Sequence, residues 1–151
     1  MFFTTDLATI SHGIQLAVAP VFLLTAVSGM IGAVAGRLAR IIDRARLLED
    51  RVEAAPVDKP MTAEYAELAR LRKRGALVNA CIALLTFCAI LIGLTIVVLF
   101  LGETTELQIY RVATFCFLSG VLFFLAALLC FFYETLLATR ILKFRRPPKN
   151  V

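Results

Sequence analysis

The sequence predicts an all-α membrane protein with three transmembrane helices, the first two of which extend into a long antiparallel cytoplasmic helical hairpin. The composition is the first reason: 60% of the 151 residues are hydrophobic, 18% are charged, and the mean hydropathy is +0.87. A water-soluble fold of this size has too small an interior to hide so much apolar surface. Three long uncharged runs and an uneven distribution of Lys and Arg are the other reasons.

The three uncharged runs define the predicted spans within a single membrane domain, residues 1–151. We expect the spans at residues 11–36, 75–102 and 112–137, because each contains the about 20 apolar residues that a helix needs to cross the hydrocarbon core. No Lys or Arg precedes the first run, which is also longer than the about 7–15 apolar residues of a signal peptide. The first span is therefore expected to remain as a permanent helix.

Basic residues predict the orientation of the spans. Fifteen of the 16 Lys and Arg residues lie in segment 37–74 or after the third span, and only Arg111 lies between the second and third spans. Cytoplasmic segments carry the excess of basic residues in membrane proteins. The sequence thus places segment 37–74 and the basic tail, residues 138–151, in the cytoplasm. The N-terminus and the loop at residues 103–111 are expected outside.

Segment 37–74 continues the helical pattern of the spans on either side. Apolar residues at alternating spacings of three and four predict two seams that cross the membrane boundary without interruption. A break at residues 55–61 is indicated by Pro56 and Pro60, and Thr62 is expected to cap the next helix. The first seam comprises Leu24, Val27, Ile31, Val34, Leu38, Ile41, Ala45, Leu48 and Val52, and the second comprises Leu68, Leu71, Gly75, Val78, Ile82, Leu85, Ala89, Ile92, Ile96 and Leu99.

One face of the first helix consists of small and weakly polar residues. Such residues let helix backbones approach closely inside a membrane. They pack either against the other helices of the same chain or against copies of the same helix, and the sequence leaves both alternatives open. Pro20, in the same span, is expected to kink the helix, with a gating hinge as the alternative. The predicted packing residues are Thr25, Ser28, Gly29, Gly32, Gly36 and Ala39.

Basic residues also cluster where the first two spans meet the cytoplasm. The simplest interpretation is lipid anchoring, because anionic headgroups attract such residues. In a ring-shaped oligomer, those of the first helix would instead form a cationic collar at a pore mouth. Glu134 is the one acid near membrane depth, and we expect it to pair with an arginine of this cluster. The cluster comprises Arg37, Arg40, Arg44, Arg51, Arg70, Arg72, Lys73 and Arg74.

The sequence predicts neither catalysis nor a cofactor. His12 is the single histidine, and no nucleophile–base set, metal-binding pattern or phosphate-binding loop is recognisable. The four cysteines lie inside apolar runs and are interpreted as small buried hydrophobes. Segment 37–74 has ten basic residues, but seven acidic residues lie among them, so we discount nucleic acid as a partner.

Two stretches of the first helix carry a family resemblance. The stretch IQLAVAPVFLLT at residues 14–25 and the stretch RLARIIDRAR at residues 37–46 resemble a widespread family of bacterial membrane proteins known as domain of unknown function 2721. The resemblance is strongest over residues 11–54. It implies a location in the bacterial inner membrane, and it adds no active site because no activity is established for that family.

Two functions are compatible with these features. The first is a homo-oligomer of about four to six copies in the bacterial inner membrane, with the first helix nearest the axis, which would function as an ion channel or pore. The alternative is a membrane scaffold whose cytoplasmic hairpin binds a protein partner. The expected partners are therefore further copies of the chain, anionic lipids and, in the alternative, a cytoplasmic protein.

Overall fold

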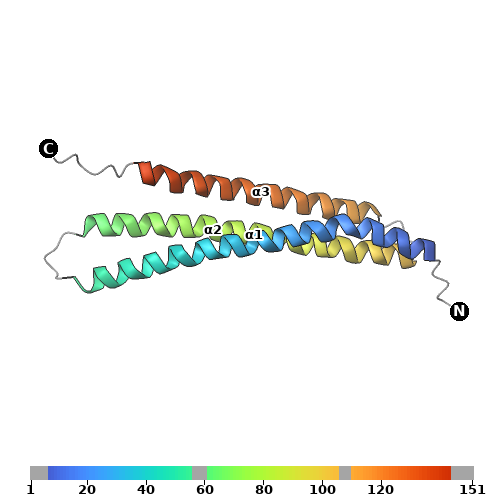
Figure 1. Ribbon diagram of the computed structural model, residues 1–151, viewed down its shortest axis with the longest axis horizontal. Coiled ribbons are helices and arrows are strands. Elements are labelled where there is room, and N and C mark those ends of the chain that lie inside the picture. Colours follow the sequence, from blue (N-terminus) through green and yellow to red (C-terminus); the bar gives the residue numbers. More distant parts are fainter. Residues whose placement is uncertain (1–6, 56–60, 106–109, 144–151) are drawn as a thin grey trace. The chain divides into compact units, whose positions relative to one another are not determined.

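Three long helices make up the computed structural model, which describes residues 7–55, 61–105 and 110–143. They are α1 (Leu7–Glu53), α2 (Thr62–Thr105) and α3 (Tyr110–Lys143), coloured along the sequence in Figure 1. Each contains a stretch that is long and apolar enough to cross a membrane. The prediction of an all-helical fold with three helices that could span a membrane is confirmed for the described residues.

The helix ends differ from the predicted boundaries in three places. The Met61 carbonyl accepts a bond from the Tyr65 amide, so Met61 occupies the capping position and Thr62 is the first helical residue. α2 continues to Thr105 and α3 begins at Tyr110, inside the predicted loop at 103–111. α3 also continues to Lys143, into the predicted tail at 138–151, because no helix-breaking residue occurs before Pro147. Pro56 and Pro60 lie outside the described residues.

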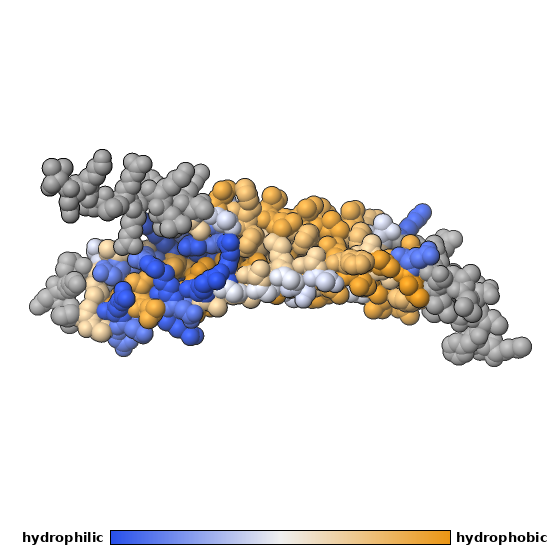
Figure 2. All heavy atoms as spheres, viewed as in Figure 1, coloured by the Kyte–Doolittle hydropathy of each residue, from blue (hydrophilic) through white to orange (hydrophobic). Residues whose placement is uncertain are grey.

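The chain divides into two compact units. The first unit comprises Met1–Gly32 with Ala83–Ala126, and the second comprises Ala33–Ile82 with Ala127–Val151. Each unit therefore contains a part of every helix, and each has its own buried core. Figure 2 shows that hydrophilic side chains gather over the end of α1 and the beginning of α2, which belong to the second unit.

The first unit is held together by apolar packing. Val27, Leu85 and Ile92 are fully buried, and the rings of Phe87 on α2 and Phe123 on α3 stack with their centroids 6.0 Å apart. Gly120 lets α3 approach α2 closely, because a Cβ atom there would lie 2.9 Å from the Ile92 Cδ1 atom. Large apolar side chains on the outside, as expected of surfaces that face lipid, include Phe22 and Phe115.

The second unit combines an apolar seam with polar contacts. Val34, Ile41, Leu71 and Val78 are buried, and the Ile41 side chain lies 3.8 Å from the position of a Cβ atom on Gly75.

All members of the two predicted seams are buried or half-buried along α1 and α2. The seam pattern predicted from the sequence therefore identifies the inward faces of both helices.

The cysteines occupy positions of intermediate or complete burial, and all four are free thiols. Cys81 and Cys88 are buried, which agrees with their interpretation as small hydrophobes, and Cys116 and Cys130 are half-buried. In the second unit, Cys81 also donates a hydrogen bond from its Sγ atom to the Ala127 carbonyl at 3.0 Å. This bond ties α2 to α3.

Candidate functional site

Three charged residues from three helices meet in the second unit. Arg37 is the first charged residue after the apolar run of α1, Arg74 is the last before the run of α2, and Glu134 is the first after the run of α3. Each apolar run thus ends at one member of the group. We call Arg37, Arg74 and Glu134 the boundary triad.

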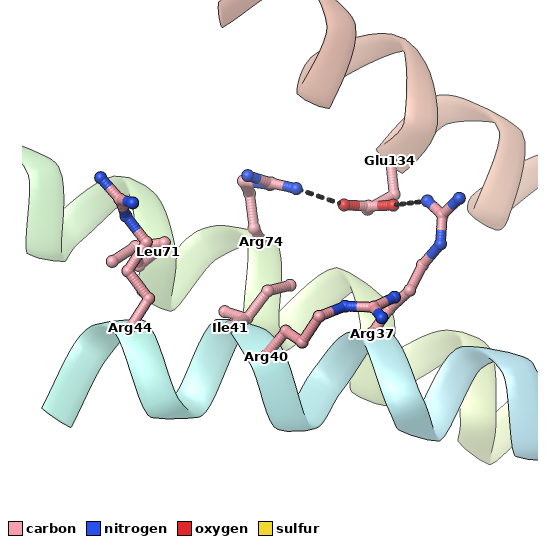
Figure 3. A pocket seen from close by; sticks show the side chains of 7 residues that line it. All are labelled: Arg37, Arg40, Ile41, Arg44, Leu71, Arg74 and Glu134. Carbon is pink, nitrogen blue, oxygen red and sulfur yellow. Dashed lines mark hydrogen bonds and ion pairs between the residues drawn. The ribbon is translucent and has the colours of Figure 1, made fainter. Parts of the chain in front are cut away.

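Glu134 is the centre of the triad and is almost fully buried, with 2% of its side chain exposed. Its Oε1 atom accepts a hydrogen bond from Arg74 Nη2 at 2.7 Å, and its Oε2 atom accepts one from Arg37 Nη1 at 3.1 Å. Figure 3 shows the two guanidinium groups approaching the carboxylate from opposite sides. Each oxygen of the buried carboxylate therefore has its own arginine partner, which offsets the cost of burying a charged group.

Further contacts fix the orientation of Arg37. Its Nη1 atom also donates to the Thr135 hydroxyl at 3.2 Å, and its guanidinium carbon lies 4.7 Å from the centre of the Phe131 ring. The Thr135 hydroxyl in turn donates to the Phe131 carbonyl at 2.9 Å. One turn of α3 therefore holds Arg37 through an ion pair, a hydroxyl and an aromatic face.

Arg74 is held less completely. Its Nη2 atom makes the ion pair with Glu134, whereas its Nε atom is buried and has no hydrogen-bond partner in the described part of the chain. Within the triad, Arg74 therefore contributes a single short hydrogen bond.

A pocket of about 260 Å³ opens beside the triad. Four arginines line it, and Figure 3 shows the Arg40 side chain running along α1 toward Arg37. Two apolar side chains of the seam, Ile41 and Leu71, complete the wall. The lining residues are Arg37, Arg40, Ile41, Arg44, Leu71, Arg74 and Glu134.

Two ion pairs outside the triad also involve arginines of the predicted cluster. Arg44 Nη2 pairs with Glu67 Oε1 at 2.7 Å and Arg72 Nη2 pairs with Glu49 Oε1 at 3.5 Å, both between α1 and α2 and both exposed. Arg51, Arg70 and Lys73 are exposed and lie outside the pocket lining. The structure therefore brings together half of the predicted cluster, and it supplies Glu134 with the arginine partners that the sequence anticipates.

The small-residue face of α1 forms a second feature. Gly29, Gly32 and Gly36 have open space where a Cβ atom would lie, with nothing within 4 Å. Thr25 is exposed and its hydroxyl donates to the Val21 carbonyl at 3.1 Å, and Ser28 and Ala39 are exposed as well. This face is therefore not packed against α2 or α3 within either unit.

Pro20 and a neighbouring groove lie in the first unit. Pro20 is buried inside α1, which continues on both sides of it. An apolar groove of about 290 Å³ extends along the same part of α1 and reaches α2 at Ile96 and Phe100. Among the described residues, no group of three or more His, Cys, Asp or Glu side chains is placed to hold a metal ion.

A comparison with protein families gives one match. The model for a protein of unknown function (DUF2721) matches residues 17–144, a range that includes both features described above. No curated protein and no solved structure matches the chain.

Proposed function

Because the chain belongs to the DUF2721 family, whose function is not established, we propose from its own residues that it forms a homo-oligomer in the bacterial inner membrane, assembled through α1. The observation that carries this proposal is the open face of α1 at Gly29, Gly32 and Gly36. In a membrane, helices associate through small residues because lipid supplies no hydrophobic force between them. A second copy of the chain would pack its own α1 against this face.

Leu47, which lies outside the apolar run, is a second observation that favours a contact between copies on this face of α1. It lies eleven residues, about three helical turns, beyond Gly36 on the same side of α1, and 59% of its surface is exposed. Charged residues surround it in the sequence, so lipid tails do not cover this position. A neighbouring copy of α1 would cover Leu47 and the glycine face together.

The proposed assembly includes the cytoplasmic hairpin and the predicted orientation. Contacts in the second unit support an antiparallel hairpin, because Ile41 lies beside Gly75 whereas Arg44, further along α1, pairs with Glu67, earlier in α2. The excess of basic residues in segment 37–74 supports its cytoplasmic location. In this arrangement the hairpins of neighbouring copies extend side by side from the membrane.

Native mass spectrometry of the full chain in mild detergent tests the assembly. We expect about four to six copies, and we expect Gly32→Leu to dissociate them because the leucine fills the space that a neighbouring helix needs. Gly93→Leu on α2 is the matched control, since Gly93 also has open space in the single chain. A monomeric wild type, or equal loss of the oligomer in both variants, would contradict assembly through α1.

Disulfide cross-linking tests whether α1 lies nearest the axis. Leu47→Cys and Tyr65→Cys are a matched pair, because both parent residues are 59% exposed and one lies on α1 and the other on α2. We expect cross-linked dimers with Leu47→Cys and none above the wild-type background with Tyr65→Cys. The reverse result would place α2 at the contact between copies and would reject the proposed axis.

An ion channel is the further form of this proposal. With α1 nearest the axis, its four arginines at the membrane boundary would form a cationic collar that favours anions: Arg37, Arg40, Arg44 and Arg51. Anion flux in proteoliposomes tests the collar: Arg40→Glu should reduce the flux, whereas Arg70→Glu on α2 should not. Flux that is unchanged by Arg40→Glu would remove the collar from the proposal.

A membrane scaffold is the second candidate function. It is favoured by the exposure of Tyr65, near the beginning of α2. An aromatic side chain outside the apolar runs is typical of a binding surface for another protein. This function can be tested in cells by proximity labelling, with a labelling enzyme inserted into the chain after residue 58. If proteins labelled by the wild type are no longer labelled by Tyr65→Ser, the result would support the scaffold. If both label the same proteins, the result would exclude a role for this surface.

A further inference from the structure

We propose that the pocket beside the boundary triad binds a phosphate group, supplied by an anionic lipid. Arg40 would hold the phosphate together with Arg37, Arg44 and Arg74, against a wall formed by the seam residues. The site lies within one chain, so it does not depend on the oligomer proposed above.

The charge of the pocket favours an anion. Four guanidinium groups and a single carboxylate line it, and the two oxygens of Glu134 are already occupied by Arg37 and Arg74. Arg44 pairs with Glu67, whereas Arg40 forms no salt bridge among the described residues. Positive charge therefore exceeds negative charge around the cavity, and Arg40 has its full charge available for a ligand.

The chemistry of the lining groups suits an oxyanion such as phosphate. The planar guanidinium group presents its N–H donors in a fork that matches the oxygens of a phosphate. Arg37 is already fixed against Phe131 and Thr135, so its orientation does not have to be acquired on binding. The cavity volume of about 260 Å³ is several times the ~30 Å³ that one water molecule takes in the liquid, so a phosphate with its ester carbons can enter.

The position of the pocket favours a lipid as the source of that phosphate. The triad marks the end of all three apolar runs, and this is the depth at which headgroup phosphates lie. Ile41 and Leu71 offer apolar surface beside the arginines, which suits the glycerol carbons next to a headgroup phosphate. Inorganic phosphate has no carbon atoms that could contact these two residues.

Binding of defined lipids to the full chain in detergent tests the proposal. The probes are dioctanoyl phosphatidylglycerol, dioctanoyl phosphatidylcholine and inorganic phosphate, with bound molecules counted by native mass spectrometry. We expect phosphatidylglycerol to bind more tightly than phosphatidylcholine, and Arg40→Gln to weaken its binding about tenfold. Arg46→Gln is the matched control, because Arg46 is an exposed arginine of the same helix outside the pocket lining.

The outcomes separate the source of the phosphate from the existence of the site. Retention of phosphatidylglycerol that depends on Arg40 and resists competition by inorganic phosphate supports a lipid site. Binding of inorganic phosphate that depends on Arg40 supports the phosphate site but rejects the lipid as its source. Equal weakening by Arg40→Gln and Arg46→Gln, or no preference for phosphatidylglycerol, overturns the proposal. Arg40→Lys, which keeps the charge but lacks the planar fork, should restore part of the affinity.

Discussion

At the scale of single residues, Glu134 determines how the three helices meet in the second unit. A buried charge is tolerated only when it is paired, and this carboxylate has one arginine for each of its oxygens. The arginines come from α1 and α2, so one side chain of α3 joins both of the other helices. Its loss therefore affects more than one contact.

Substitution of Glu134 should be much more costly than substitution of an exposed acid. Glu134→Gln leaves two guanidinium groups facing each other without a carboxylate, and we expect the free energy of unfolding to fall by about 3 kcal/mol. Glu67→Gln removes only the exposed pair with Arg44, so it should cost less than about 1 kcal/mol. Unfolding of both variants in mixed detergent micelles measures the difference. Equal losses of unfolding free energy would show that the buried ion pairs of Glu134 stabilise the fold no more than the exposed pair of Glu67 does.

A second prediction at this scale concerns the close contact at Gly120. Gly120→Ala places a Cβ atom 2.9 Å from Ile92 Cδ1, and Ile92 is fully buried, so its side chain has little freedom to move away. We expect a loss of about 1–3 kcal/mol from this overpacking. Ile92→Val removes the Cδ1 atom, and the double variant should be more stable than the sum of the two single losses predicts. A purely additive double variant would contradict the contact.

At the scale of elements, the sequence predicts the buried seam of α1 from Leu24 to Val52. It does not predict the buried positions of α1 before Leu24. From Leu24 to Val52 the larger apolar residues recur at spacings of three and four among small or polar ones, so the inward face is recognisable. Gly13, Ala17 and Pro20 continue the buried face toward the N-terminus, but they are small and lie among residues that are apolar on every side. Hydropathy carries no information about burial where lipid covers the outside of a helix.

The same limit explains what the sequence missed in α2 and at the site. Cys81, Cys88 and Thr95 form a second buried line at intervals of seven residues, and of these the sequence predicts burial of the two cysteines but not of Thr95. The sequence did anticipate that Glu134 pairs with an arginine of the cluster, and both Arg37 and Arg74 do so. Which four of the eight basic residues share a pocket depends on the rotation of α1 and α2 about their axes, and the sequence does not fix that rotation to a single side chain.

Two neighbouring leucines test the seam outside the apolar run. Leu48 is buried in the seam of α1, whereas Leu47 is 59% exposed. Leu48→Ala should lower the free energy of unfolding by about 2–3 kcal/mol, because it leaves a cavity between helices. Leu47→Ala should change this energy by less than about 0.5 kcal/mol in the dissociated chain, since it removes no contact there. Urea unfolding below the concentration at which copies associate measures both, and a reversed order would reject the seam in this segment.

At the scale of the whole molecule, the charge distribution predicts the orientation in the membrane. Fifteen of the 16 basic residues fall on one side of the three apolar runs, and the opposite side has only Arg111. Thr104→Cys and Arg51→Cys therefore should lie on opposite sides of the membrane. A maleimide that cannot cross the membrane should label Thr104→Cys in cells with a permeabilised outer membrane, and Arg51→Cys only after the inner membrane is also disrupted. The four native cysteines lie within apolar runs, so the wild type gives the background. Labelling of Arg51→Cys while the inner membrane is intact would reverse the orientation, and it would place the arginine pocket on the outer surface.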